Sequence, residues 1–237
     1  MIKRMTLVRR ATGVPPDEFG WRWREQAEKA LSSMASADRP SRLAHCVVRP
    51  GRGDRAYDGV AISWHHDEEA IASHDLWMAE PRSQGSVLDE DTTTHLLVEE
   101  RTVNGGGWLD AQWRYERGRR RLLLIGFIEA AAPLTREQFR DYWWQQHRPL
   151  ANRLVPAPLE PVAYVHDYVR PGEAGRWAGI GEMYERSLDT ARERGAWFAS
   201  EAALPIVADE KRFLVRGTRQ VLITDHEIIV YDEGEPE

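Results

Sequence analysis

The stretch RLLLIGFIEAAAPLTREQFRDYWW, residues 121–144, decides the fold that this sequence predicts. Its apolar run is typical of a buried strand, and the proline that follows indicates a turn. Thr135 and Gln138 have the spacing of a helix capping box, in which each side chain binds the backbone amide of the other residue. The stretch therefore predicts a strand, a turn and then a helix that begins near Thr135.

The same pattern occurs earlier, in MTLVRRATGVPPDEFGWRW, residues 5–23. Self-similarity at a fixed distance is the signature of an internal repeat. Three landmark pairs are 120 residues apart and the histidine pair is 121 apart: Phe19 with Phe139, His45 with His166, Gly59 with Gly179, and Asp89 with Asp209. The sequence therefore predicts two copies of one unit.

Each copy has the order strand, helix, strand, strand, helix, strand, which is that of the ferredoxin-like unit. In the second copy the expected elements are 121–129, 135–154, 161–170, 178–186, 188–203 and 219–230. A sheet with helices on one face leaves its other face apolar, so a second copy can cover it. We expect an α+β fold in which two βαββαβ repeats pack sheet to sheet as an intramolecular α/β barrel. Residues 1–103 would form a degenerate structural repeat, 104–120 a linker, and 121–237 the repeat with the principal pocket.

The composition indicates a globular protein that needs neither disulfides nor metal to fold. Its 237 residues are 42% hydrophobic and 30% charged, and the net charge of −6 argues against a nucleic-acid surface. Cys46 is the only cysteine, and the N-terminus lacks the apolar core of a secretory signal. No apolar run is long enough to span a membrane. We expect a cytoplasmic protein, either a monomeric pseudo-dimer or a homodimer, whose partner is a small hydrophobic substrate.

Four segments of the second copy carry a family likeness: LTREQFRDYWWQQHRPL, AYVHDYVRP, AGIGEMYE and ALPIVADEKRF. With them the second copy resembles an EthD domain, a member of the dimeric α/β-barrel superfamily. The first copy is similar but more divergent, so the whole chain resembles a tandem EthD protein. The resemblance implies a pocket between helices and sheet. It also implies a relation to cofactor-independent cyclases, dehydratases, decarboxylases, isomerases and monooxygenases of catabolic or polyketide-type metabolism, and to haem-binding branches. Because chemistry varies so much on this fold, the fold alone carries little functional weight.

His147 is the leading candidate for a reactive group. On the predicted helix it follows Phe139 and Trp143 at intervals of four residues, so all three share the face that packs on the sheet. It is either a core histidine, bonded to a backbone carbonyl or to Asp209, or a general acid or base. At a separation of 120 residues its counterpart in the first copy is Ala27, which indicates that the architecture does not require a histidine there.

Other ionisable residues of the second copy could complete a site. The strand that contains His166 alternates, which places it on one face with Tyr164 and Tyr168, although His45 at the same place favours a structural role equally. Glu182 lies among small and apolar residues, where burial would raise its pKa and pairing with arginine would lower it. Asp209 could cap a helix or orient a histidine. The candidate acid/base groups are His147, His166, Glu182, Tyr142 and Asp209, and the candidate substrate-binding residues are Phe139, Trp143, Tyr164, Tyr168 and Tyr184.

The sequence favours acid/base chemistry without a cofactor. The run WHHDEEA, residues 64–70, contains metal-capable side chains, but adjacent histidines point in opposite directions and the acids are typical of a helix N-terminus. We expect no metal and no cofactor. The first hypothesis is a lyase, dehydratase, cyclase or isomerase that acts on an aromatic or polycyclic carbonyl compound. The alternative is a binding or accessory protein that uses the same pocket, and haem binding or monooxygenation ranks behind both.

Overall fold

The computed structural model describes residues 1–50, 56–79, 86–115, 119–173, 175–215 and 220–231. The chain divides into two compact units. Unit 1 comprises Met1–Val98, Ala111–Arg120 and Thr224–Glu237, and unit 2 comprises Glu99–Asp110 and Arg121–Ile223. Strands β4 (Thr94–Asn104) and β8 (Gln220–Tyr231) contribute several residues to each unit, and the first residue of β5 (Arg120–Glu129) belongs to unit 1.

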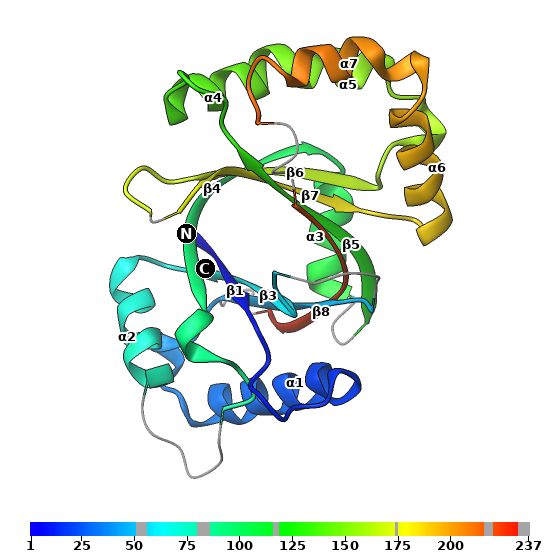
Figure 1. Cartoon of the computed structure of the whole chain (residues 1–237). Coiled ribbons are helices and arrows are strands. Elements are labelled where there is room, and N and C mark those ends of the chain that lie inside the picture. The colour runs from blue at the N-terminus through cyan, green and yellow to red at the C-terminus, as the bar shows by residue number, and fades with distance from the viewer. Residues whose placement is uncertain (51–55, 80–85, 116–118, 174, 216–219, 232–237) are drawn as a thin grey trace. The chain divides into compact units, whose positions relative to one another are not determined.

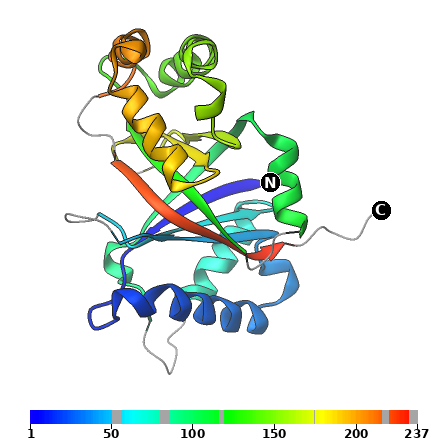
Figure 2. The same cartoon turned by 90° about the vertical axis from the view of Figure 1, so that its right-hand side faces the viewer.

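Unit 1 is a sheet with helices on one face, as Figures 1 and 2 show. Its strands lie in the order β4-β1-β3-β2-β8, and each neighbouring pair is antiparallel. Besides its parts of β4 and β8, its elements are β1 (Ile2–Val8), α1 (Pro16–Ser33), η1 (Ser36–Asp38), β2 (Arg42–Val48), β3 (Gly59–His65), α2 (Glu68–Ala79) and η2 (Glu90–Thr92).

Unit 2 has the same arrangement, with its helices over one face of the strands (Figure 1). Its strand order is β8-β5-β7-β6-β4, and the pairs β5–β7 and β6–β7 are antiparallel. Besides its parts of β4 and β8, its elements are β5 (Arg120–Glu129), α4 (Arg136–Tyr142), the π-helical turn η3 (Trp143–His147), α5 (Arg148–Leu154), η4 (Ala157–Leu159), β6 (Ala163–Val169), β7 (Trp177–Tyr184), α6 (Leu188–Phe198), η5 (Glu201–Ala203) and α7 (Leu204–Glu210).

The hydrogen-bonded strand order, β1-β3-β2-β8-β5-β7-β6-β4, is that of a closed barrel. Within each half the order of the four strands is fourth, first, third, second, which is that of a ferredoxin-like unit. The predicted α+β barrel fold is therefore confirmed. Thr135 caps α4 with Gln138 in a full capping box, as the spacing of the two residues predicted.

The segment 104–120, which was expected to be a linker, contains a helix, α3 (Gly106–Tyr115). This helix follows Gly105, whose φ of +74° lies in the left-handed region that favours glycine. A Cβ added to Gly105 would lie 2.3 Å from the carbonyl oxygen of Val162 and 2.6 Å from the Cα of Ala163. The glycine therefore allows two backbone segments of unit 2 to approach closely.

The two units have matching cores between helix and sheet. In unit 2, Phe139 and Trp143 pack with Ile128, while in unit 1 Phe19 and Trp23 pack with Val8. The same contact with a strand glycine recurs: a Cβ on Gly179 would lie 2.6 Å from the Trp143 ring, and one on Gly59 would lie 2.6 Å from the Trp23 ring. These aromatic side chains therefore pack on a strand in the same way in both units.

The π-helical turn is a one-residue insertion in the helix of unit 2. In an α-helix the Trp143 carbonyl would accept the amide of residue 147, but here it accepts the amide of Arg148. After the turn the separation between copies is 121 residues, as the short helices η1 (Ser36–Asp38) and η4 (Ala157–Leu159) show. The counterpart of His147 is therefore Gln26 rather than Ala27. The Gln26 side chain accepts the backbone amide of Val87 at 3.1 Å, so this position is polar in both units.

The pairing of Asp209 with Asp89 is wrong. In unit 1 the amide of Asp89 binds the carbonyl of Arg9 at 2.9 Å, and in unit 2 the equivalent bond joins Val215 to Glu129, also at 2.9 Å. The separation at this point is 126 residues rather than 120, because the segment before it differs in length. Asp89 therefore corresponds to Val215, and the counterpart of Asp209 falls at residue 83, outside the described residues.

Candidate functional site

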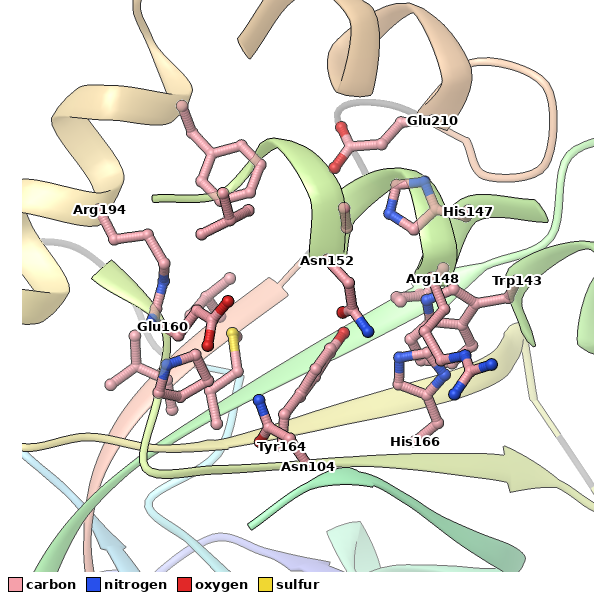
Figure 3. Close-up of a pocket in the computed structure, with 18 of the residues that line it drawn as sticks. Asn104, Trp143, His147, Arg148, Asn152, Glu160, Tyr164, His166, Arg194 and Glu210 are labelled. Carbon is pink, nitrogen blue, oxygen red and sulfur yellow. The ribbon is translucent and has the colours of Figure 1, made fainter. Parts of the chain in front are cut away.

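A cavity of about 270 Å³ lies between the helices and the sheet of unit 2 (Figure 3). Its wall is mostly apolar, and its polar groups come from β4, from the helix that contains His147, from the turn before β6, from β6 itself and from helices α6 and α7. The residues that line it are Asn104, Leu124, Ile128, Trp143, His147, Arg148, Ala151, Asn152, Val155, Glu160, Pro161, Tyr164, His166, Met183, Ala191, Arg194, Gly195, Phe198, Glu210, Phe213, Leu214 and Val221.

His147 is held by a carboxylate. Its Nδ1 lies 2.9 Å from Oδ2 of Asp209, on α7, and its ring lies 4.8 Å from the ring of Phe213. The hydroxyl of Tyr142 donates to the other carboxylate oxygen, Oδ1 of Asp209, at 2.6 Å. The side chains of His147 and Asp209 are only 12% and 11% exposed, so little solvent competes for the bond between them.

This geometry fixes the tautomer of neutral His147. The carboxylate can only accept, so the Nδ1 of His147 carries the proton and donates it. Nε2 then has a free lone pair, and among the described residues it has no hydrogen-bond partner. Because His147 lines the cavity, the arrangement provides a base with its conjugate acid stabilised by Asp209. The pKa of Tyr142 is raised, first by burial and then by its bond to Asp209, so its hydroxyl stays protonated and continues to donate.

His166 is the second histidine in the cavity wall. Its ring stacks on Trp143, with centroids 3.7 Å apart and planes at 18°, and its Nδ1 lies 3.2 Å from the hydroxyl of Tyr168. Burial lowers the pKa of His166 well below its ordinary value, and the charges of His147 and Arg148 lower it further. His166 is therefore neutral at physiological pH and unsuited to serve as a cationic acid.

The stack on tryptophan also occurs in unit 1, where His45 lies 3.8 Å from Trp23 with the planes at 12°. Burial, and then the charge of Arg24, lower the pKa of His45 to about 3. The aromatic stack and the neutral histidine are therefore features of the fold. What unit 2 adds is the hydroxyl of Tyr168, because the corresponding residue in unit 1 is Val47.

The buried neutral His45 should make the protein less stable in mild acid. Its folded pKa of about 3 is below the ordinary value of 6.5, so between these values the unfolded chain binds the proton and the folded chain does not. The stabilisation is present above pH 6.5 and is lost as the pH falls, by at most about 1.4 kcal/mol per pH unit. We expect His45→Gln to lessen the loss in unfolding free energy between pH 7 and 5 by about 2 kcal/mol, measured by urea denaturation.

The control for this experiment is His66→Gln, because His66 is exposed. It should retain the pH dependence of the wild type. Equal pH dependence in all three proteins would contradict the prediction, whatever the absolute stability of His45→Gln.

The structure brings most of the predicted site residues together in unit 2. Four of them line the cavity: Trp143, His147, Tyr164 and His166. Asp209 binds His147, and Tyr142 binds Asp209. Tyr168 binds His166. Phe139 is fully buried in the core next to Trp143 and does not line the cavity.

Glu182 and Tyr184 lie elsewhere. In the β6–β7 register His166 pairs with Gly181, and Val165 pairs with Glu182. Because neighbouring side chains alternate between the faces of a sheet, Glu182 and Tyr184 point to the face opposite His166. There the Tyr184 hydroxyl donates to the Glu182 carboxylate at 3.0 Å. The structure therefore does not place these two residues in this cavity.

Sequence reasoning missed several polar residues of the cavity wall. Figure 3 shows Arg148 beside His166, with Asn152 close to Tyr164, and Glu160 and Arg194 together on the other side. The only signal in the sequence was that Arg148 immediately follows His147. The sequence did not reveal the π turn, Trp143–His147, that directly precedes Arg148.

The described residues contain no group of three or more His, Cys, Asp or Glu side chains arranged to hold a metal ion. In the run at residues 64–70, the buried His65 binds the hydroxyl of Ser63 at 3.0 Å, while His66 is exposed. The acids of that run begin helix α2 at Glu68, as expected. No helix within the described ranges is long and apolar enough to cross a membrane.

Residues 131–217, which lie within unit 2, match the family model of the EthD domain. A search of curated protein sequences finds no match. Among solved structures, an anthrone oxidase-like protein is 11% identical, with 100% of this chain and 96% of that chain covered and a TM-score of 0.58. A mutant chlorite dismutase from Candidatus Nitrospira defluvii is 12% identical, with 96% and 92% covered and a TM-score of 0.54. A proposed monooxygenase from Lactobacillus acidophilus NCFM is 11% identical, with 98% and 96% covered and a TM-score of 0.50.

The class of protein follows from the fold and these comparisons. The chain has the fold of the dimeric α/β-barrel superfamily, and the part of it that contains the cavity is similar to an EthD domain. At such low identity the solved structures support the fold alone. The family match covers less than half of the chain, so a second EthD copy in unit 1 stays a prediction.

Proposed function

We propose that unit 2 is an acid/base catalyst that removes a proton from carbon next to a carbonyl group of a small hydrophobic compound. The observation that carries this proposal is the bond between Nδ1 of His147 and Oδ2 of Asp209, which leaves Nε2 as a base at the cavity. A histidine oriented by a buried carboxylate is the arrangement by which enzymes hold a general base in the active tautomer.

The proposed step moves one proton and one electron pair. Nε2 of His147 takes the proton from the α-carbon, and the electrons of the C–H bond pass into the carbonyl, which becomes an enolate. The imidazolium that forms is stabilised by the Asp209 carboxylate, which stays ionised. Return of the proton to another atom would make the reaction an isomerisation, and loss of a leaving group from the enolate would make it an elimination of the lyase or dehydratase type.

The shape of the cavity supports an aromatic substrate of modest size. Its volume of about 270 Å³ lies near the lower end of the range of about 300–1,000 Å³ that is usual for ligand pockets. Trp143 and Tyr164 offer aromatic surfaces, and Met183 and Phe198 add apolar contacts. One or two fused rings fit this space better than a larger polycyclic compound.

A binding protein without catalysis is the second candidate. It is favoured by the predominantly apolar wall and by the recurrence of the tryptophan–histidine stack in unit 1, which supports a packing role for His166. A binding protein would hold the same ligands and release them unchanged.

Deuterium exchange distinguishes the two candidates without knowledge of the natural substrate. Bicyclic aryl ketones such as 1-tetralone are incubated with the protein in deuterated water, and NMR records loss of the α-proton signal. We expect the wild type to accelerate exchange for at least one ketone, and His147→Gln to slow it about 10²- to 10⁴-fold, the usual contribution of a general base.

The matched control is His66→Gln, which replaces an exposed histidine of unit 1. It should catalyse exchange of the ketone at the wild-type rate. Ketones that bind and raise the melting temperature, yet exchange equally with wild type and His147→Gln, would establish the binding protein and refute the catalyst.

A further inference from the structure

Arg148 contributes a cation to the wall of the cavity. Its Nε donates to the backbone carbonyl of Trp144 at 3.2 Å, and its guanidinium lies over the Trp144 ring at 4.0 Å. These two contacts fix the side chain and leave its terminal nitrogens available. Among the described residues no carboxylate lies within ion-pair distance of it.

The other arginine of the cavity wall is different. Arg194 is bonded to the carboxylate of Glu185, and the two side chains are 7% and 0% exposed. Its charge is therefore neutralised within the protein. Figure 3 shows that Arg194 lies on the far side of the cavity, whereas Arg148 lies beside His166 on the same side as His147. An anionic oxygen next to the base would therefore meet Arg148 rather than Arg194.

His166 can supply a second donor at the same place. It is neutral, so it carries one proton on one ring nitrogen. Burial raises the pKa of Tyr168 far above its ordinary value, so its hydroxyl keeps its proton and can donate to Nδ1 of His166. When the hydroxyl donates, the proton of His166 lies on Nε2. In unit 1, where Val47 replaces the tyrosine, Nδ1 of His45 has no such hydroxyl to bind, so this bond is specific to unit 2.

We propose that Arg148 and His166 form an oxyanion-binding pair, and that the ligand of unit 2 is a compound whose oxygen carries negative charge when bound, namely an enolate or a phenolate. The inference rests on the proposed function and names its substrate class: a ketone or phenol able to place this charge on oxygen. When Nε2 of His147 takes the proton, the electron pair of the C–H bond ends on the carbonyl oxygen, which the guanidinium and the Nε2–H of His166 stabilise. Donors placed in advance where charge develops are a major source of rate enhancement.

A chromophoric phenol tests the pair directly. Bound 4-nitrophenol is titrated by absorbance, since its neutral and ionised forms have different spectra. We expect Arg148→Gln to raise the pKa of the bound phenol by about one unit, a tenfold fall in the ratio of ionised to neutral phenol, because a nearby opposite charge shifts a pKa by this amount or more. Arg148→Lys should retain most of the effect. Tyr168→Phe, which removes the bond to Nδ1 of His166, should also raise the pKa of the bound phenol, but by less than Arg148→Gln does.

The matched control is Arg153→Gln, since Arg153 lies on the same helix, is exposed and does not line the cavity. It should leave the titration unchanged. The proposal is overturned if Arg148→Gln binds the phenol with the wild-type pKa, if Arg153→Gln has an equal effect, or if the wild type binds no phenol.

Measuring exchange with His147→Gln beside the phenol titration of Arg148→Gln separates this proposal from the proposed function. If proton abstraction by His147 is wrong but the oxyanion pair is right, His147→Gln leaves exchange unchanged while Arg148→Gln still shifts the bound phenol. If only the pair is wrong, His147→Gln abolishes exchange and Arg148→Gln leaves the phenol unshifted.

Discussion

Asp209→Asn is expected to slow α-proton exchange by about 10²- to 10⁴-fold while His147 stays in place. Tyr142 donates to one oxygen of residue 209, so the asparagine would present its carbonyl oxygen to Tyr142 and its amino group to Nδ1 of His147. An amino group donates, so Nδ1 would have to accept and the proton would move to Nε2. The base would then be blocked at the nitrogen that faces the cavity. Exchange of 1-tetralone in deuterated water measures the loss.

The double variant Asp209→Asn with Tyr142→Phe provides the control for this mechanism. Without the hydroxyl, the asparagine amide can turn so that its oxygen accepts from Nδ1 of His147, which restores the active tautomer. We expect the double variant to catalyse α-proton exchange of the ketone faster than Asp209→Asn alone does. If adding Tyr142→Phe only slows exchange further, the tautomer argument is wrong and Asp209 acts through stability or charge alone.

Gly105→Ala is expected to lower the free energy of unfolding by about 2–5 kcal/mol. A side chain in the left-handed region costs about 1–2 kcal/mol, and overpacking adds typically 1–3 kcal/mol. Here the new atom would meet the backbone of Val162 and Ala163, which cannot rotate away as a side chain could. Urea denaturation at neutral pH would measure the loss as a lower midpoint.

Gly107→Ala is the matched control, because a Cβ at Gly107 meets nothing within 4 Å and the residue lies in helix α3. Alanine is the better helix former, so this variant should be neutral or more stable by up to about 1 kcal/mol. Equal free energies of unfolding of Gly105→Ala and Gly107→Ala would contradict the prediction that the close approach at Gly105 makes a side chain destabilising there.

Local patterns predicted the elements of unit 2 closely. The helix expected at 135–154 is observed as α4, the π turn and α5, which together span residues 136–154, and the strands expected at 161–170 and 178–186 are observed at Ala163–Val169 and Trp177–Tyr184. These elements follow from the period of apolar residues, from capping and from turn residues, all of which are short-range. Helices α3 and α7 were missed: α3 lies in the segment expected to be a linker, and α7 (Leu204–Glu210) lies between the elements expected at 188–203 and 219–230.

Register along the repeat was harder to predict than the repeat itself. One inserted residue in the π turn moves the counterpart of His147 from Ala27 to Gln26, and a longer insertion moves that of Asp209 away from Asp89. Both insertions were hidden in the sequence, because similar residues still occur about 120 positions apart. The backbone hydrogen bonds, which can be seen only in the structure, reveal them.

The order of strands and helices, the aromatic stripe of the helix and the inward face of His147 could be predicted from the sequence, because they depend on periodicity within single elements. Only the tertiary structure decided that Asp209 reaches Nδ1 of His147, that Glu182 and Tyr184 face away from His166, and that Arg148 shares the cavity wall with His166. Each of these depends on the pairing of residues distant in sequence, which is set by strand register and by one extra residue in a helical turn.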